Sequence, residues 1–347
     1  MLEPWEGQPT PRLYGFTVRQ VGAALARVGA SYRDTAAWVR QRAGRPLPVR
    51  RRGRRLIDGS RHAQLVSDWV SVFAPVIWAA YAPTEWPARL IIDEDEYRAA
   101  RPAGGRRGQL LFTVLGAVGY PSRSGRPLVC RVQAVDHKPD AVSWADFLTG
   151  LGGQPEFVVT DGAPVILSGA RMAWPSAADT RAGRPQLYRC EWHLLRGLTQ
   201  PLARALGEDP RDQPRHPLTR AARTCLTSHA HWVAFEQALY RQAQDTPDLN
   251  AAITWVQLNH DRVTTQITNR PSVGPYSLGP LEEAFRDIGA HLDYRAETMT
   301  NRHRTNRLLT LLAAHHNGWT DEAQWAEIIR EHLHQAHGRA HPQRVFQ

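Results

Sequence analysis

The sequence predicts an α/β protein with a mixed β-sheet, a helical insertion and an N-terminal all-α helix-turn-helix. Three observations support this prediction. Apolar runs of strand length alternate with helical patterns between residues 89 and 189, a long helical stretch covers about 195–275, and two short capped helical segments precede residue 43. Strands that alternate with helices are typical of α/β sheets.

Two short helices are expected within residues 13–42. Thr17 and Gln20 match a capping box at the start of the first helix. Gly29 gives a short break, and Ser31 then caps the second helix. This arrangement matches a DNA-binding helix-turn-helix in residues 1–43, with an ordinary αα-hairpin as the alternative. The residues expected on the exposed side that faces a DNA groove are Tyr32, Arg33, Thr35 and Arg40.

Residues 44–60 are expected to form a basic linker, because they are rich in Pro, Gly and Arg. A dense run of arginines cannot be buried, and it can neutralise several phosphates of a nucleic acid. A solvated tether with no fixed contact is the alternative. The arginines that define this candidate DNA-binding run are Arg50, Arg51, Arg52, Arg54 and Arg55.

Residues 61–318 are expected to form the main domain. After a helical segment at 60–85, strand patterns occur at 89–93, 109–120, 126–135, 155–161 and 186–189, with helices expected at 141–151 and 163–174. Turn residues between the second and third strands predict a hairpin. This order of elements is that of a ribonuclease H-like core, in which later strands run parallel.

The helical insertion of about 195–275 follows the last strand, and a helix that begins near Gly279 comes after it. Two further helices are expected at 306–314 and 321–334. Residues 319–347 are therefore interpreted as a C-terminal helix and tail.

The charge of the chain points to a nucleic-acid partner. There are 43 Lys and Arg residues against 33 Asp and Glu residues, a net charge of +10, and arginine dominates the positive side. Arginine gives planar, bidentate contacts to phosphate. A compositional bias from a high-GC genome is the alternative explanation for the arginine content.

The composition also bears on the cellular compartment. Only three cysteines occur, which argues for a reducing cytoplasm and against a disulfide framework. The first residues lack the basic and apolar pattern of a signal peptide, and no apolar run reaches about 18 residues. We therefore expect a soluble cytoplasmic protein with no membrane contact.

Three acidic residues occupy positions suited to catalytic carboxylates. Asp93 follows an apolar strand, Asp161 ends another and precedes Gly162, and Glu282 lies in the first turn of a helix. Hard oxygen ligands of this kind hold Mg²⁺ or Mn²⁺ pairs in phosphoryl-transfer sites.

Each acid also has a structural interpretation. Asp161 can be a helix N-cap or an Asx-turn residue, the acidic run from Asp93 can be a solvated turn, and Glu282 is favoured in a first turn by the helix dipole. The acids that compete as ligands are Asp95, Glu283 and Glu297.

His193 belongs to a Cys190-x-x-His193 pattern that follows the fifth strand. A catalytic role for His193 beside the carboxylates, plain core packing, and a zinc site with Cys225, His229 and His231 are the three interpretations. Further along the chain, residues 300–307 are dense in phosphate-binding donors, among them Arg302 and Arg304. We expect this segment to bind DNA near the site, with a solvated polar turn as the alternative.

Three short segments together resemble bacterial insertion-sequence transposases of the DDE class. They are Val158-Val159-Thr160-Asp161-Gly162, Tyr188-Arg189-Cys190-Glu191-Trp192-His193 and Gly279-Pro280-Leu281-Glu282. The resemblance covers about residues 14–335 and is closest to Mutator-like and related clades with a Cys-x-x-His signature. The chain has Leu278, Glu283 and Phe285 where those proteins commonly have Asn, Gly and Asn.

The resemblance implies a DNA transposase in which Asp93, Asp161 and Glu282 hold two Mg²⁺ or Mn²⁺ ions. The implied partners are double-stranded element ends and target DNA, with two copies of the chain pairing the ends at the bacterial nucleoid. A catalytically inactive, domesticated DNA-binding protein and a structure-specific nuclease of the same fold are the alternatives.

Overall fold

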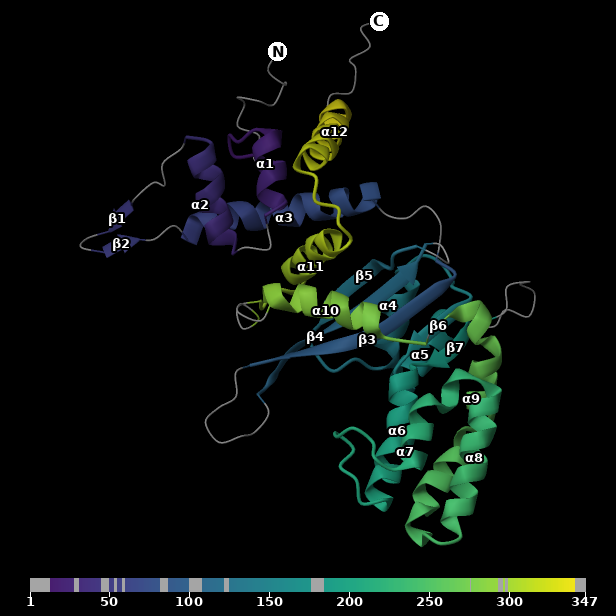
Figure 1. Cartoon of the computed structure of the whole chain (residues 1–347). Helices are drawn as coiled ribbons and strands as arrows, with labels where there is room; N and C mark the ends of the chain where they lie inside the picture. The colour runs from purple at the N-terminus through teal and green to yellow at the C-terminus, as the bar shows by residue number, and fades with distance from the viewer. Residues whose placement is uncertain are drawn as a thin grey trace, which may run out of the picture. The chain divides into compact units, whose positions relative to one another are not determined.

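The chain is described by a computed structural model, in which two compact units are distinguished (Figure 1). One unit comprises Met1–Trp86, Glu94–Pro139 and Leu281–Gln347, and the other comprises Pro87–Asp93 and Asp140–Pro280. The residues that the structure describes are 13–27, 31–44, 50–52, 55–57, 60–81, 87–99, 108–121, 125–175, 184–274, 276–292, 296 and 299–340.

A mixed five-stranded sheet confirms the predicted α/β class. Its order is β5-β4-β3-β6-β7. β4 and β5 pair antiparallel, as the hairpin prediction required, whereas β6 runs parallel to both β3 and β7. The strands are β3 (Arg89–Arg98), β4 (Leu110–Tyr120), β5 (Leu128–Val135), β6 (Phe157–Thr160) and β7 (Gln186–Arg189).

The prediction that the first strand ends at Asp93 is wrong, because β3 continues to Arg98. Tyr97 explains the extension. Its ring stacks on that of Phe112 with centroids 4.8 Å apart, so apolar packing resumes after the acidic run.

The first unit assembles helices from both ends of the chain. The capping box of Thr17 and Gln20 is present at the start of α1 (Val18–Leu25), and Ser31 caps α2 (Tyr32–Arg42). α1 packs on α12 (Glu322–Ala340), and α2 packs on α3 (Ser60–Tyr81). The unit boundaries thus differ from the predicted domain boundaries at residues 43 and 318. The predicted turn at Gly29 and Ala30 lies outside the described residues.

Gly22 accounts for the close approach of α1 to α12. A Cβ at this position would lie 2.9 Å from the backbone nitrogen of Ala326. A backbone atom cannot move aside as a flexible side chain can, so only glycine allows this contact.

The backbone of the predicted linker contains a short antiparallel hairpin. β1 (Arg50–Arg52) pairs with β2 (Arg55–Ile57), with Arg50 opposite Ile57. Arg54 lies outside the described residues, as do the side chains of the other four arginines of the run. Their predicted DNA contacts therefore stay predictions.

One helix of the described part of the chain has the length and composition to cross a membrane. This segment, Ala63–Tyr81, belongs to α3. Its side chains at Trp69, Phe73 and Ile77 are buried inside the unit, against α2, α11 (Arg302–His316) and α12. The burial is that of a core helix and is compatible with a soluble protein.

Asn306 of α11 and Asn317, the C-cap residue that follows this helix, occupy the outer edge of β5. The amide of Asn317 accepts from the Val129 N–H at 2.8 Å and donates to the Val129 carbonyl at 3.0 Å. Asn306 repeats this double contact at Ala134. A bulge in the β4–β5 pairing lies between the two contacts, so both Val129 and Ala134 turn their backbone groups toward α11.

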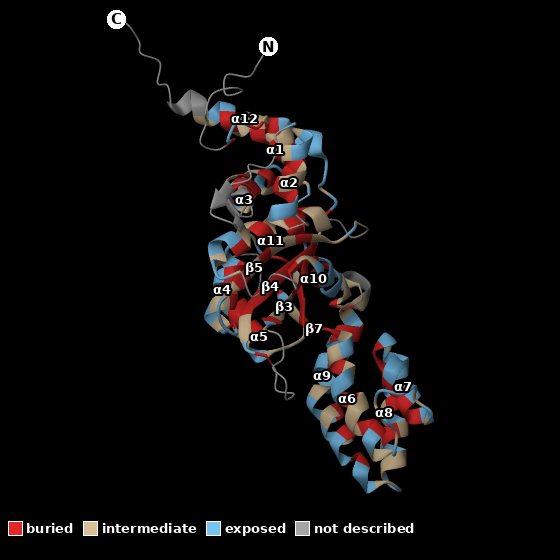
Figure 2. Cartoon of the chain, turned by 90° about the vertical axis from the view of Figure 1, so that its left-hand side faces the viewer, coloured by how far each residue is buried: buried red, intermediate tan, exposed pale blue. Residues whose placement is uncertain are grey.

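The second unit contains α4 (Ala141–Thr149) and α5 (Pro164–Ala173), which pack together, and the predicted helical insertion. The insertion consists of α6 (Glu191–Ala205), α7 (Pro217–Thr224), η1 (Cys225–Thr227), α8 (His229–Ala243), η2 (Pro247–Leu249) and α9 (Asn250–Val273). It has a core of its own, in which Leu198, Trp232 and Phe235 are fully buried (Figure 2).

Candidate functional site

Asp93 and Asp161 occupy equivalent positions on neighbouring parallel strands. Leu90 pairs with Val158 and Ile91 with Val159, an offset of 68 residues. Continued two residues beyond the last pair, the same offset leads from Asp93 to Asp161, the residue that follows β6. Asp161 directly follows the last residue of β6, whereas β3 continues past Asp93 to Arg98. The carboxyl edge of parallel strands is where open α/β sheets place their functional groups.

Asp161 is oriented by an Asx-turn. Its Oδ1 accepts from the Ala163 N–H at 2.7 Å and from the Thr160 hydroxyl at 3.2 Å. Among the described residues, both hydrogen bonds of this carboxylate use Oδ1, which leaves Oδ2 for a ligand. The Asx-turn interpretation is confirmed, whereas α5 takes Ala163 as its N-cap. An oriented carboxylate with one oxygen available suits a hard cation.

Gly162 is required at the turn after Asp161 for two reasons. Its φ of 88° lies in the left-handed region, and a Cβ here would lie 2.8 Å from Cδ of Arg189. The Arg189 side chain therefore crosses the turn, and its Nε donates to the Asp161 carbonyl at 2.7 Å. Burial, followed by the charge of Arg262, lowers the pKa of Arg189.

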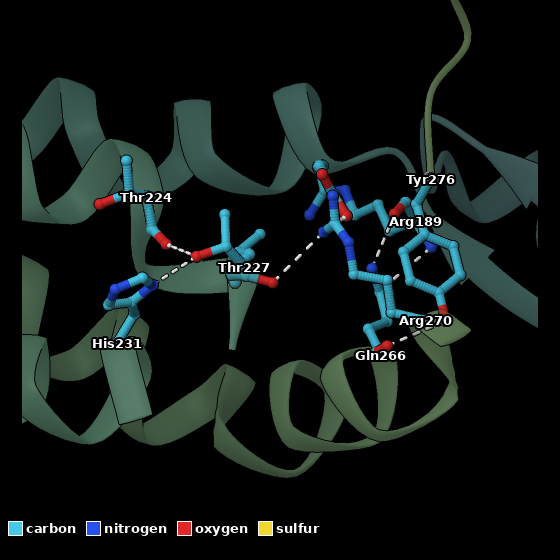
Figure 3. Close-up of polar contacts among 9 residues, drawn as sticks. Arg189, Thr224, Thr227, His231, Gln266, Arg270 and Tyr276 are labelled. Atoms are coloured by element: carbon cyan, nitrogen blue, oxygen red, sulfur yellow. Dashed lines mark hydrogen bonds and ion pairs between the residues drawn. The ribbon is translucent and has the colours of Figure 1, made fainter. Parts of the chain in front are cut away.

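The backbone of Arg189 is held in turn by Gln266 from α9 (Figure 3). The Gln266 side chain accepts from the Arg189 N–H at 3.1 Å and donates to the Arg189 carbonyl at 3.0 Å. The Tyr276 hydroxyl donates to the Gln266 carbonyl at 2.9 Å. The insertion thus fixes the end of β7, beside the strand that carries Asp161.

Glu191 and Arg270 form a partly buried ion pair at the first turn of α6. Burial raises the pKa of Glu191, and the neighbouring Arg270 guanidinium opposes this rise. The Glu191 N–H donates to the Tyr276 carbonyl at 2.8 Å. These contacts join α6 and α9 to the segment that leads toward Glu282.

In the segment from Cys190 to His193, the cysteine side chain is buried, whereas the side chains of Trp192 and His193 are more exposed. Cys190 is 3% exposed, whereas Trp192 is 60% exposed with the Arg196 guanidinium 5.1 Å from its ring. The His193 ring meets Trp192 edge-on at 4.7 Å. His193 therefore lies at the start of α6, on the element that follows β7.

The zinc interpretation gains no support. The described residues contain no group of three or more His, Cys, Asp and Glu side chains placed to hold a metal ion. His231 instead bonds to the Thr227 hydroxyl at 2.6 Å (Figure 3), and His229 bonds to that of Thr268 at 3.0 Å.

Glu282 belongs to the other unit, on α10 (Gly279–Leu292). It is exposed and follows Leu281, which packs with Phe285 over Gly116 of β4. Of the three predicted acids, Asp93 and Asp161 thus belong to one unit and Glu282 to the other. Of the competing acids, Asp95 lies within β3, Glu283 is exposed on α10, and Glu297 lies outside the described residues.

The predicted DNA-binding residues of the first unit have different surroundings. Tyr32, Arg33 and Arg304 line one cavity, while Arg40 lies in the last turn of α2. Thr35 is buried and its hydroxyl donates to the Arg27 carbonyl, so it does not face a groove as predicted.

Arg302 is held by groups of its own unit. Its side chain pairs with Asp136 at 2.5 Å, donates to the Leu111 carbonyl at 3.1 Å and lies over the Phe112 ring. These contacts give Arg302 a structural role that the polar sequence around it did not suggest.

Comparison with known proteins finds no family model that matches the chain and no curated protein with significant similarity.

Sequence reasoning missed the residues that support the Asp161 turn. Arg189 belongs to the segment Tyr188–His193 that carries the family resemblance, so its position next to Cys190 could have indicated a role near the site. Gln266 gave no signal, because a glutamine 77 residues further on in a helical insertion has no pattern that links it to β7.

Proposed function

We propose that the chain is a DNA transposase of the DDE class, which cuts and joins element ends by phosphoryl transfer with Mg²⁺ or Mn²⁺. The observation that carries the proposal is the register of the parallel strands β3 and β6, whose offset of 68 residues leads from Asp93 to Asp161. A carboxylate at the carboxyl end of β6, with a second one on the neighbouring parallel strand, suits the binding of hard divalent cations.

The strand order supports a ribonuclease H-like core. An antiparallel pair, β4 and β5, precedes the parallel strands β6 and β7, and β3 lies between them. The capped pair α1 and α2 is consistent with a helix-turn-helix, and the net charge of +10 favours DNA as the partner.

The chain's own residues have distinct parts in this proposal. Asp161 offers Oδ2 as a ligand because the Asx-turn holds Oδ1, and Arg189 fixes the turn through the Asp161 carbonyl. Asp93 adds a second carboxylate, and Glu282 is the proposed third. Bound divalent cations supply activation of water or a 3′-hydroxyl and stabilisation of the leaving oxygen.

His193 and the basic residues complete the proposal. His193, at the start of α6, would form a hydrogen bond to DNA or to a site carboxylate. Two copies of the chain would pair the two element ends, in the cytoplasm at the nucleoid.

A second function has one observation in its favour. The described residues hold no group of three metal-binding side chains, and Glu282 lies on an exposed turn of the other unit. A catalytically inactive DNA-binding protein of the same fold needs no such group.

A joining assay tests the proposal. The full chain is incubated with Mg²⁺, a target plasmid and duplexes copied from the DNA that flanks its own gene. We expect joined products from the wild-type chain and none from Asp161→Asn. Asp245→Asn, the same chemical change at an exposed position of the same unit, is the control and should join normally.

The outcomes separate the candidate functions. Cleavage without joining indicates a nuclease, and DNA binding without either indicates the inactive protein. Undiminished joining by Asp161→Asn contradicts the proposed site.

A further inference from the structure

The first unit contains a cavity of about 710 Å³ with walls from three segments. The first turn of α2, the part of α3 from Ala63 to Ser67, and the segment from Met299 into α11 surround it. Its volume falls within the range of about 300–1,000 Å³ that is typical of small-molecule sites. All its walls belong to one unit, and the Asp93–Asp161 pair belongs to the other.

The charged lining of the cavity favours an anion. Two arginines, Arg33 and Arg304, line the cavity together with one carboxylate, that of Asp34. The Asp34 carboxylate already accepts a hydrogen bond from the Ser31 hydroxyl at 2.6 Å. Arg304 is exposed and has no ion-pair partner among the described residues; its guanidinium contacts the Gln64 side-chain oxygen at 3.5 Å. A guanidinium that is not committed to a carboxylate can take a phosphate in bidentate fashion.

The rest of the lining favours an apolar, planar body on the same ligand. Ala63, Met299 and Leu308 supply apolar surface, and Tyr32 supplies an aromatic ring. An inorganic anion would leave this surface unused, and an uncharged ligand would leave Arg304 without a counter-charge. A nucleobase stacks on aromatic side chains, and its phosphate pairs with arginine.

We propose that this cavity binds a single nucleotide, with its phosphate on Arg304 and Arg33 and its base against Tyr32 and the apolar wall. The nucleotide is either free or the unpaired end of a DNA strand. Only the second source rests on the proposed DNA function.

Calorimetric titration of the full chain tests this proposal. The probes are a deoxynucleoside monophosphate, inorganic phosphate, and duplexes with and without one unpaired terminal nucleotide. Arg304→Gln should weaken nucleotide binding at least about tenfold, because a charge-assisted contact to the phosphate is lost. Arg307→Gln removes the same charge from the same helix outside the cavity, and it should bind as the wild type does.

Tyr32→Leu is the second variant, and it should weaken binding of the monophosphate and leave inorganic phosphate unaffected. Preference for the duplex with an unpaired end identifies DNA as the source, and binding of the monophosphate alone identifies a free nucleotide. Equal binding by Arg304→Gln and Arg307→Gln, or equal binding of monophosphate and inorganic phosphate, overturns the proposal. Asp161→Asn should bind nucleotide normally, so a failure of DNA joining is distinguishable from a failure of this site.

Discussion

The pairing of Ile91 with Val159 sets the register of β3 and β6, and the same offset leads from Asp93 to Asp161. Like charges brought close together repel, and a bound cation relieves the repulsion. Under the proposed function, the binding of Mg²⁺ at these two acids therefore adds to the stability of the chain.

Mg²⁺ should raise the melting temperature of the wild-type chain and not that of Asp161→Asn. A ligand that binds only the folded state stabilises it, and the variant loses one of the two carboxylates. Asparagine keeps an oxygen for the Ala163 N–H, so the turn itself survives. Differential scanning fluorimetry over a Mg²⁺ series measures the shift, with Asp245→Asn as the control. An equal shift in all three proteins would show that Mg²⁺ acts elsewhere.

Gly162→Ala should destabilise the second unit by more than about 2 kcal/mol. Left-handed backbone costs about 1–2 kcal/mol for a residue with a Cβ, and the Arg189 side chain must also move. Gly152→Ala isolates the first effect, because Gly152 has φ of 83° and nothing within 4 Å of its added Cβ. Urea unfolding monitored by tryptophan fluorescence gives both values. Equal losses would mean that the Arg189 contact contributes nothing.

Asn317→Ala should cost about 1–3 kcal/mol of the free energy of unfolding, because Val129 then loses the partners of two buried backbone groups. Asn250→Ala, at an exposed position, is the matched change and should be close to neutral. Thermal unfolding of the three proteins provides the comparison. A neutral Asn317→Ala would show that water replaces the amide.

Glu191 gives a pH dependence with a definite sign. Its pKa is raised in the folded chain, mainly by burial, so the folded state binds the proton more tightly than the unfolded state does. Stability from this group is present at low pH and is lost as pH rises through the raised pKa. The difference in free energy of unfolding between wild type and Glu191→Gln should therefore fall as pH rises above about 4.3, the ordinary glutamate value. A difference that is constant from pH 4 to 7 would contradict the shift.

The elements that local chemistry determines could be predicted from the sequence. Thr17 and Ser31 cap helices as expected, and the strand at Gln186–Arg189 has the predicted bounds. The division into units could not be predicted, because it depends on contacts such as Gly22 with Ala326, which are more than 300 residues apart in sequence.

The candidate site likewise has features that the local sequence predicts and features that depend on contacts between distant residues. Asp161 follows the apolar strand β6, so its place at a sheet edge could be inferred, whereas the continuation of β3 past Asp93 and the register of the two strands required the structure. Arg189 and Gln266 form hydrogen bonds because the helical insertion brings α9 next to the end of β7, and no local sequence pattern predicts this arrangement. Their role beside Asp161 therefore emerged only from the folded chain.

The amide contacts along the outer strands have a consequence for assembly. β5 has its outward backbone groups at Val129 and Ala134 occupied by Asn317 and Asn306, and β7 has those of Arg189 occupied by Gln266. A neighbouring molecule that offered a strand to either border would have to displace these side chains first. Under the proposed function, two copies of the chain on two DNA ends are therefore expected to meet through helices or through the DNA and not through their sheets.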